Sequence, residues 1–419
     1  MRICYLCADL GISLSGHSGS SAHVRNLVRA WTDWGHEVIV VSHAGNAQAD
    51  IGVPIIPVPA PEIFEALIVE GNQLLEANAG SEQWARMRVI RALGHIWTNV
   101  ELEKVLRSVL CDYQPDFIYE RYSPFSIAGV LMARLMGFPH VLNVNAPLAW
   151  EGARYRRQAL QEAAETLEET AFRSASQIVT TCQELKDDLI AAGVQEARIA
   201  VAPMAVDVDL LTPDGPTARD GLDGKIVIGF LGSLKPWHGI EILAEAFRFL
   251  AGDARFHLMI VGEGPMAKTV HALEEELPGR VTFVGAVPQS EVPRYLRAMD
   301  VAVAPYPELE RFYYSPLKVL EYMASGRAVV ASRIGQIIQL IREGETGLLV
   351  TPGNAKELAE TVQKLAADQR LRSHLGARAR EEICLHHTWT HRAHAILDFV
   401  LNGGSLRSSS QQFQKGVEL

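Results

Sequence analysis

Two segments of the chain place a cation beside a glycine-containing turn, a combination suited to binding phosphate. In the segment GFLGSLKPWHG, Gly232, Ser233 and His238 surround Lys235, and a helical stretch follows. Glycine lets a backbone approach a ligand closely, and the start of a helix favours an anion. Lys235 is a compact charge suited to a diphosphate. Taken alone, the segment could equally be an ordinary turn with a solvated lysine.

The segment SPLKVLEYMASG is more informative. Ser315 and Pro316 can start a helix, and the amides of Leu317 and Lys318 would then be free at its first turn. Lys318 and Glu321 would share one face of that helix. This face offers a cation for phosphate and a carboxylate for sugar hydroxyls. By spacing alone, a surface ion pair is the more common case.

Further glycine-marked turns follow other apolar runs. In the N-terminal half, the loop SLSGHSGSSAHV precedes a helical stretch, in which Gly19 and Ser20 are candidates to bind an anion and Ser20 and Ser21 to cap the helix. Two more turns supply the candidates Gly262 and Gly264 in VGEGP and Gly285 and Val287 in VGAVP. Several such turns in one chain go beyond routine turn chemistry.

The runs that position these turns predict parallel sheets. They are apolar without polar alternation, which is typical of strands buried on both faces: RICYLCA, EVIVVS, PDFIYE, PHVLNVN, QIVTTC and IAVAPM, then KIVIGFLGS, FHLMIVGEG, VTFVGAV, VAVAPY, AVVAS and GLLV. Helical stretches separate them, and several end at glycine. The predicted fold is α/β, with two Rossmann-like parallel-sheet domains facing a central cleft. Ligands should bind at the carboxyl ends of the strands.

Composition shifts divide the chain. Residues 1–206 form the expected N-terminal domain, 207–224 a linker rich in Pro, Gly and Asp, and 225–388 the C-terminal domain. Within the first domain, 63–110 is expected to be a mostly helical insertion. The polar end, 404–419, is expected to be a disordered tail.

In that insertion the apolar candidates for packing are Trp84, Leu93, Trp97, Leu102 and Leu106.

Charge and cysteine usage exclude several classes of protein. The 419 residues include 39 Lys and Arg against 49 Asp and Glu, so the net charge is −10 and nucleic-acid binding is not expected. Five cysteines cannot form a disulfide framework, and Cys4 and Cys7 are expected to pack in a strand. No apolar run reaches the ~18 residues of a membrane span. A cytoplasmic protein is expected, with at most peripheral contact at the inner face of a membrane.

His387, His391 and His394 have helix-like spacing, so two of them could form a zinc-binding pair. The sequence shows no third ligand of suitable chemistry, so no metal is expected.

From residue 1 to about 402 the chain resembles glycosyltransferase family 4. The resemblance rests on GHEVIVVS, PMAVDVDLLTP, VGEGP, VTFVGAV, LKVLEYMASGRAVVASRIG and EGETGLLVTPGN. Members are nucleotide-sugar-dependent retaining enzymes of the GT-B fold. The resemblance implies a nucleotide-sugar donor on the C-terminal domain, with UDP-sugar favoured, and an acceptor hydroxyl on the N-terminal one. It implies no cofactor or metal, and a closing helix, 389–402, that packs back on the N-terminal domain.

The family's donor-site residues are only partly present. Glu321 matches the second Glu of the E-x7-E pattern, which holds the ribose hydroxyls, while the first Glu falls at Tyr313. Glu310 or Tyr314 could substitute for it.

The family's Arg and Lys, which neutralise the diphosphate, fall at Ser233 and His238. Lys235 and Lys318 are therefore expected to supply the charge and to act in catalysis.

On the N-terminal domain, the family's His near the transferred sugar is replaced by Asn145, which is retained as a site residue. Asn can hydrogen-bond a sugar hydroxyl but does not titrate near neutral pH. Glu120, Glu151 and Arg154 are the acceptor-binding candidates. The alternative role for these carboxylates is structural, in ion pairs of Glu120 with Arg121 and of Glu151 with Arg154.

The acceptor's identity stays open among a sugar or polysaccharide end, a lipid-linked sugar and a small metabolite. Two rival functions within catalysis are a GT-B sugar-nucleotide epimerase and a phosphorylase. A rival of another class is a non-catalytic sugar- or nucleotide-binding protein, which the residues at 145 and 313 would permit.

Overall fold

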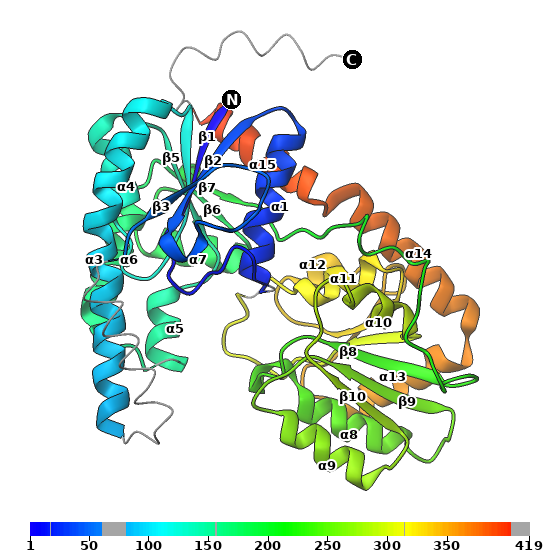
Figure 1. Cartoon of the computed structure of the whole chain (residues 1–419). Coiled ribbons are helices and arrows are strands. Elements are labelled where there is room, and N and C mark those ends of the chain that lie inside the picture. Colours follow the sequence, from blue (N-terminus) through cyan, green and yellow to red (C-terminus); the bar gives the residue numbers. More distant parts are fainter. Residues whose placement is uncertain (17, 61–80, 156, 314, 404–419) are drawn as a thin grey trace, which may run out of the picture. The chain divides into compact units, whose positions relative to one another are not determined.

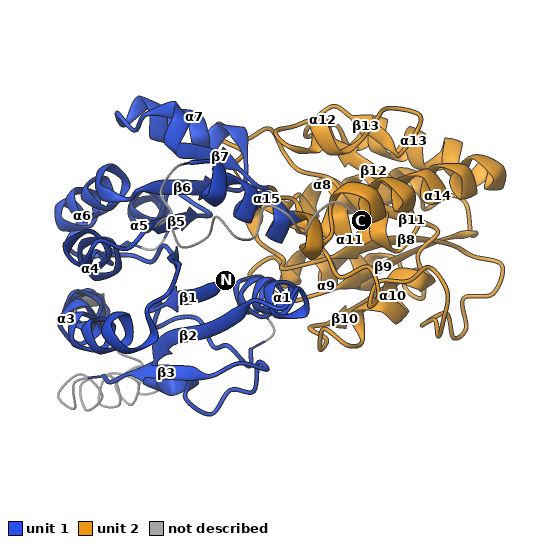
Figure 2. Cartoon of the chain, turned by 90° about the horizontal axis from the view of Figure 1, so that it is seen from above, with its two compact units in different colours: residues 1–202, 392–419 blue, residues 203–391 orange. Residues whose placement is uncertain are grey.

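The computed structural model describes residues 1–16, 18–60, 81–155, 157–313 and 315–403. The chain forms two compact units (Figure 2). Unit 1 holds residues 1–202 together with the chain from Arg392 onward, and unit 2 holds Pro203–His391. The predicted tail, 404–419, lies outside the described residues.

Unit 1 is built on a seven-stranded sheet in the order β3-β2-β1-β4-β5-β6-β7, with every pair of neighbours parallel. Its strands are β1 (Arg2–Cys7), β2 (Glu37–His43), β3 (Ile55–Val58), β4 (Phe117–Arg121), β5 (His140–Val144), β6 (Gln177–Thr180) and β7 (Ile199–Val201). The six strands predicted in this half are confirmed, and β3 was not predicted. Its helices are α1 (Gly19–Asp33), α3 (Ser81–Tyr113), α4 (Ala128–Met136), α5 (Leu148–Tyr155), α6 (Gln161–Ser174), α7 (Gln183–Ala191) and α15 (Trp389–Asn402), with 3-10 turns at Ala44–Asn46 and Glu196–Arg198.

The helices cover both faces of this sheet. Helices α3, α4 and α6 lie on one face, and α1 and α15 on the other (Figure 2). The central strands are buried from both sides, as β1 illustrates with Ile3 to Cys7 at 0% exposure. This double burial explains why these strands lack polar alternation.

Helix α3, shown in cyan alongside α4 in Figure 1, is the described part of the predicted insertion. Residues 61–80, which precede it, lie outside the described part of the chain. Leu102 and Leu106 are buried against the sheet as expected. Trp84, Leu93 and Trp97, the other apolar candidates, are 43–45% exposed. Leu93 and Trp97 fall on the face of α3 opposite to Leu102 and Leu106.

Unit 2 is built on a six-stranded parallel sheet in the order β10-β9-β8-β11-β12-β13. Its strands are β8 (Ile226–Leu231), β9 (Phe256–Val261), β10 (Val281–Gly285), β11 (Val301–Ala304), β12 (Ala328–Ser332) and β13 (Leu348–Val350), all of which were predicted. Its helices are α8 (Ile240–Leu250), α9 (Ala267–Glu276), α10 (Val292–Ala298), α11 (Leu317–Ala324), α12 (Ile337–Leu340), α13 (Ala355–Ala367) and α14 (Gln369–His386), with a 3-10 turn, η3 (Pro236–His238). The predicted α/β class, with two Rossmann-like parallel-sheet domains, is confirmed.

Each sheet has one point where the strand order reverses. In unit 1 the chain passes from β1 to β2 on one side and returns to β4 on the other, and β8, β9 and β11 repeat the pattern in unit 2. Loops leave such neighbouring strands in opposite directions, which opens a crevice at their carboxyl ends. Ligand sites are therefore expected after β1 and β4, and after β8 and β11.

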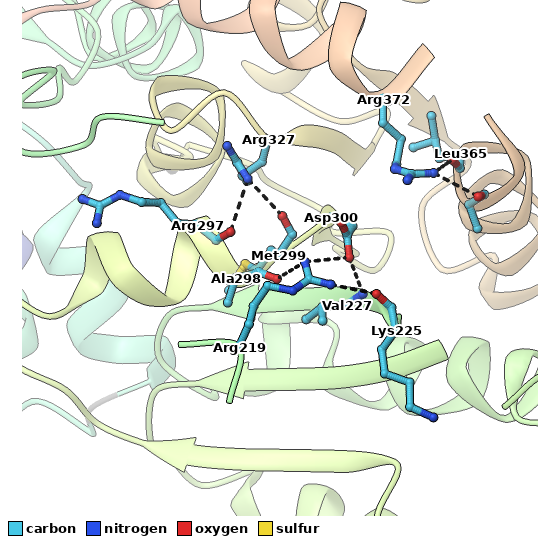
Figure 3. Close-up of polar contacts among 11 residues, drawn as sticks. Arg219, Lys225, Val227, Arg297, Ala298, Met299, Asp300, Arg327, Leu365 and Arg372 are labelled. Carbon is cyan, nitrogen blue, oxygen red and sulfur yellow. Dashed lines mark hydrogen bonds and ion pairs between the residues drawn. The ribbon is translucent and has the colours of Figure 1, made fainter. Parts of the chain in front are cut away.

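The segment expected to be a linker packs against unit 2. Arg219 donates to the carbonyl oxygens of Ala298 and Lys225 and lies 3.1 Å from an Asp300 carboxylate oxygen (Figure 3). That carboxylate also accepts the amide of Val227 at the start of β8. Arg219 therefore anchors the predicted linker to residues around the start of β8.

Two thiols are buried in the first strand of unit 1. Cys4 and Cys7 are free and buried in β1, where burial raises the pKa of each thiol to about 12. Of the helices in the described ranges, none combines the length and the apolar character needed to cross a membrane.

Candidate functional site

Three strand-end loops of unit 2 are joined by backbone hydrogen bonds. The Gly232 amide donates to Val261 at 2.9 Å, and the Leu234 amide donates to Glu263 at 2.8 Å, which joins the loops after β8 and β9. The Gly262 amide donates to Gly285 at 2.8 Å and links the loop after β9 to the end of β10. Gly232, Gly262 and Gly285 thus come together at one edge of the sheet.

Glycine is required in the middle loop. Gly262 and Gly264 have φ values of 133° and 156°, which side-chain-bearing residues rarely adopt. A Cβ on either residue would collide with the carbonyl of Gly232 or Leu234. The sequence GEG therefore permits close packing of main chains, which leaves backbone rather than side chains at this edge.

Lys318 enters this region from α11. Its side chain passes close to Gly232, where a Cβ would stand 3.2 Å from Lys318 Cε. Its Nζ lies 4.1 Å from the centroid of the Phe230 ring and 5.2 Å from that of Tyr306, within the range of cation–π attraction. Lys318 is only 7% exposed, and Nζ has no hydrogen-bond partner among the described residues. Burial lowers its pKa to about 7.

Helix α11 is fixed by Tyr322, whose hydroxyl accepts the amide of Leu231 at 2.8 Å. This bond holds the helix against the end of β8. The Leu317 amide donates to the Ser315 carbonyl at 2.8 Å, so the expectation that this amide is free is wrong. The Ser315 hydroxyl is buried and has no hydrogen-bond partner in the described part of the chain.

The charges of both candidate lysines act on His238. Its Nδ1 is 2.5 Å from the Ser233 carbonyl oxygen and 3.4 Å from the Ser233 hydroxyl. Burial, together with the charges of Lys318 and Lys235, lowers the pKa of His238 to about 3. The imidazole is therefore neutral near pH 7. Positive charge in this cluster comes from Lys318 and from Lys235, which is partly buried at the start of η3.

Glu321 follows Lys318 by one helical turn and faces the loop after β10. Gln289 Nε2 lies 3.5 Å from Glu321 Oε1. Burial raises the pKa of Glu321 to about 7, and both the Gln289 contact and the Lys318 charge oppose that rise. The structure thus brings Glu321 near the loop that carries Gly285 and Val287.

The position of the missing family glutamate is filled by a core residue. Tyr313 is 1% exposed, and Arg311 lies 6.0 Å from the centroid of its ring. Glu310 is exposed. Tyr314, the other proposed substitute, lies outside the described residues.

In unit 1 the Gly/Ser loop caps α1. The Ser18 hydroxyl accepts the Ser21 amide at 3.2 Å and contacts the hydroxyls of Ser20 and Ser21 at 3.1 and 2.8 Å. Ser18 is therefore the N-cap, which corrects the assignment of that role to Ser20 and Ser21. Gly19 is the first residue of the helix.

Glu120 lies in the interior and is not available to an acceptor. It is 1% exposed, with one carboxylate oxygen 2.8 Å from His140 Nε2 and the other accepting the Ser126 hydroxyl at 3.0 Å. The expected pairing with Arg121 is also wrong, because Arg121 contacts His23 Nδ1 at 2.8 Å. The sequence placed Glu120 at a strand end but could not show that His140, on the neighbouring strand β5, would contact it.

Asn145 follows β5. Its amide nitrogen donates to Asn143 Oδ1 at 2.8 Å, and its Oδ1 is buried without a hydrogen-bond partner among the described residues. The oxygen is thus an unused acceptor. Glu151 and Arg154 lie on α5, the first partly buried and the second exposed.

A cavity of about 390 Å³ that the sequence did not indicate lies at the carboxyl ends of β1 and β4. It is lined by Asp9, Leu10, Gly11, Ile90, Arg91, Gly94, His95 and Pro124. A useful signal was Gly94, a glycine inside a helical pattern, which often has a packing or functional reason.

His387, His391 and His394 do not belong to a larger group of potential metal ligands in the described part of the chain. Within the described ranges, no cluster of three or more His, Cys, Asp or Glu residues could hold a metal ion.

Comparisons with known proteins agree with this arrangement. Residues 18–205 match a model described as glycosyl transferase 4-like domain, and residues 225–368 match one described as glycosyl transferases group 1. HepE of Anabaena, solved in complex with UDP, is 19% identical and superposes with a TM-score of 0.70 over 96% of this chain and 100% of that chain. This likeness shows the fold, and the two matched models assign residues 18–205 and 225–368 to these two glycosyl transferase domain families.

Two relatives indicate how far the likeness extends. The 2-deoxystreptamine glucosyltransferase of Streptomyces kanamyceticus is 31% identical over 58% of this chain, and the match covers 65% of that protein. This chain therefore spans just under two thirds of that relative's length. A D-inositol 3-phosphate glycosyltransferase of Pseudarthrobacter chlorophenolicus is 27% identical. The match covers 86% of this chain and 85% of that protein.

Proposed function

We propose that the protein transfers a sugar from a nucleoside diphosphate donor, with UDP-sugar favoured, to an acceptor hydroxyl with retention at the anomeric carbon. The observation that carries this proposal is the Lys318 ammonium, which is buried beside Gly232 and has no hydrogen-bond partner among the described residues. Leaving a buried polar group unsatisfied is unfavourable unless a ligand satisfies it. A diphosphate oxygen is such a ligand.

The chemistry requires charge stabilisation above all. Transfer breaks the bond between the anomeric carbon and a phosphate oxygen, and the acceptor oxygen forms its bond on the same face. The acceptor proton passes to the departing phosphate. Negative charge therefore develops on the diphosphate, where Lys318 and Lys235 would stabilise it in place of a metal ion.

The remaining donor contacts follow from the same loops. Glu321 would accept hydrogen bonds from the ribose hydroxyls. The loop that carries Gly285 and Val287 would contact the base. UDP is favoured by the resemblance of the chain to its family, and HepE was solved with UDP and with UDP-glucose. Asn145 Oδ1 is the proposed contact for a hydroxyl of the transferred sugar.

A binding screen with and without EDTA tests the proposal. Isothermal titration of UDP, GDP and dTDP should show UDP binding most tightly, unaffected by the chelator. Incubation with the matching nucleotide-sugars should then release nucleotide, and analysis of the sugar separates transfer or hydrolysis from epimerisation. If no nucleoside diphosphate binds, the proposal is wrong. Binding without turnover of any tested sugar would favour a non-catalytic binding protein.

A further inference from the structure

The cavity in unit 1 has a defined place in the fold. Asp9 and Gly11 follow β1, Pro124 follows β4, and these two strands are neighbours at the point where the strand order reverses. Parallel sheets bind ligands at this kind of crevice. Helix α3 closes the cavity with Ile90, Arg91, Gly94 and His95.

The walls of the cavity are held rigidly. Asn99, one turn beyond His95, donates to the Phe125 carbonyl at 2.9 Å and accepts the amides of Ile127 and Ala128 at 2.8 and 2.9 Å. These bonds fix α3 to the segment that follows β4. The His95 ring is stacked on Phe125, with centroids 6.4 Å apart and 26° between their planes.

On the opposite wall, an Asp9 carboxylate oxygen accepts the Gly11 amide at 2.8 Å, which fixes the turn after β1. The cavity is therefore preformed, a property that favours ligand binding because little ordering is needed.

The polar lining is balanced in charge. Asp9 supplies a carboxylate and Arg91 a guanidinium, both close enough to His95 to influence its pKa in opposite directions. Burial, the largest effect, lowers the pKa of His95, so its imidazole is neutral near pH 7. The three side chains thus present donors and acceptors with no net charge.

We propose that this cavity binds the acceptor, and that the acceptor's bound part is a neutral polyhydroxylated ring, a pyranose or a cyclitol. This inference rests on the proposed transferase function. Vicinal hydroxyls donate to a carboxylate and accept from a guanidinium at the same time, so Asp9 and Arg91 match them together. The apolar side chains of Leu10, Ile90 and Pro124 would contact the C–H faces of the ring.

The same lining disfavours charged rings. A phosphate placed beside Arg91 would also approach the Asp9 carboxylate, and an ammonium beside Asp9 would also approach the guanidinium. Like-charge contacts of this kind reduce affinity for the wrong ligand. The volume of about 390 Å³ lies at the small end of ligand pockets, so it suits one or two rings rather than a long chain.

Ligand-observed NMR on the full-length protein tests this inference. The neutral probes are methyl α-D-glucopyranoside, methyl α-D-mannopyranoside, methyl α-D-galactopyranoside and myo-inositol. Glucose 6-phosphate and glucosamine are charged counterparts. Saturation transfer should reach at least one neutral probe. It should be at least tenfold weaker for the charged counterparts at equal concentration.

Two variants locate the binding. Arg91→Met removes the guanidinium and should weaken the bound neutral probe at least tenfold. Gly94→Leu fills the cavity and should abolish its binding. Arg107→Met is the matched control. Arg107 lies on the same helix in a surface pair with Glu103, so this variant should bind the probe normally. Circular dichroism verifies that each variant is folded, and Arg91→Met, at an exposed position, gives a result even if Gly94→Leu does not fold.

Three results would overturn the inference: no neutral probe binds, a charged counterpart binds more tightly, or both variants bind the neutral probe normally. UDP titration of the same samples separates this outcome from that of the proposed function, because the donor residues lie in unit 2. If the wild-type protein does not bind UDP, the proposed donor site is wrong. Normal UDP binding with no probe binding would contradict the cavity assignment alone.

Discussion

Glu120 in unit 1 and Lys318 in unit 2 are both buried ionisable groups, yet their surroundings differ. Both carboxylate oxygens of Glu120 have partners, His140 and Ser126. The Lys318 ammonium lies over the faces of two aromatic rings and has no hydrogen-bond partner among the described residues. A satisfied buried group stabilises one conformation, whereas an unsatisfied one destabilises the free protein until a ligand arrives. The difference separates a structural site from a binding site more clearly than residue type does.

The largest expected effect comes from removing the unsatisfied cation. Lys318→Met should weaken UDP binding about 100-fold or more, because a buried charge-assisted contact to phosphate is lost. The free variant should nevertheless be more stable than wild type. Its free energy of unfolding at pH 6 should be about 1–2 kcal/mol higher, because no charge is left buried. Titration calorimetry and thermal unfolding measure the two effects.

The pH dependence of that stability gain has a definite sign. Folding lowers the pKa of Lys318 from 10.5 to about 7. Between these values the unfolded chain holds a proton that the folded chain lacks, so wild type gains stability as pH rises. The advantage of Lys318→Met should therefore shrink from pH 7 to pH 10. Lys268→Met, at an exposed position on α9, should change neither binding nor stability. Equal losses in both variants would contradict the assignment.

The opposite effects on stability and on UDP binding are expected at Glu120, whose two carboxylate oxygens both have partners. Glu120→Gln should lower the free energy of unfolding by about 2–4 kcal/mol, because it disrupts a buried hydrogen-bonded pair, while UDP binding stays normal. Denaturant unfolding provides the measurement. Glu169→Gln affects only an exposed pair with Arg173 and should cost less than about 0.5 kcal/mol. A stable Glu120→Gln variant that fails to bind UDP would reverse the comparison.

A smaller effect should follow from titrating Lys318 in the Glu321→Gln background, where the neighbouring carboxyl no longer titrates. Binding of a UDP-sugar, whose diphosphate does not ionise in this range, should weaken above about pH 7 by up to tenfold per pH unit. The cause is loss of the ammonium proton, whose pKa is about 7 in the free protein. Removing Glu321 also removes a charge that raises this pKa, so the fall should begin somewhat lower. A flat profile between pH 6 and 9 would show that Lys318 does not contact the diphosphate.

The smallest effect concerns Glu321 itself. At pH 8, Glu321→Gln should weaken UDP by about tenfold, because an ionised carboxylate accepts ribose hydroxyls more strongly than an amide does. At pH 6 the loss should be smaller, since burial raises the pKa of Glu321 to about 7 and the wild-type carboxyl is then largely protonated. The matched ligand is 2′-deoxy-UDP, which should be less affected. Equal losses for both nucleotides would contradict a role at the ribose.

Much of the fold was predictable because its strands are buried on both faces. Runs such as FHLMIV in β9 have no polar alternation, and glycine marks the end of α4, where Gly137 has a φ of 73°. β3 was not predicted, and only its last residue, Val58, is buried, so its pattern is weaker. Residues 207–224 were predicted to be a linker from their composition, which does not show that Arg219 would contact Asp300.

The candidate site was predictable only where spacing along one element decides it. Lys318 and Glu321 lie on one helix, so the sequence shows their proximity. The partners of Glu120 come from another strand and from a loop, and the sequence gives no sign of them. The cavity combines the turn after β1, helix α3 and Pro124, and no local pattern spans that distance.

The route of the chain also has a consequence for biosynthesis. Unit 1 is interrupted by unit 2 and is completed only when α15 arrives, with Arg392 donating to the Ala202 carbonyl and Gln177 donating to the carbonyl of Phe399. On the ribosome, every residue of unit 2 is made before Arg392. The second unit can therefore fold while the first still lacks its last helix, and a nascent chain arrested before α15 leaves β6 and the end of the first segment without these partners.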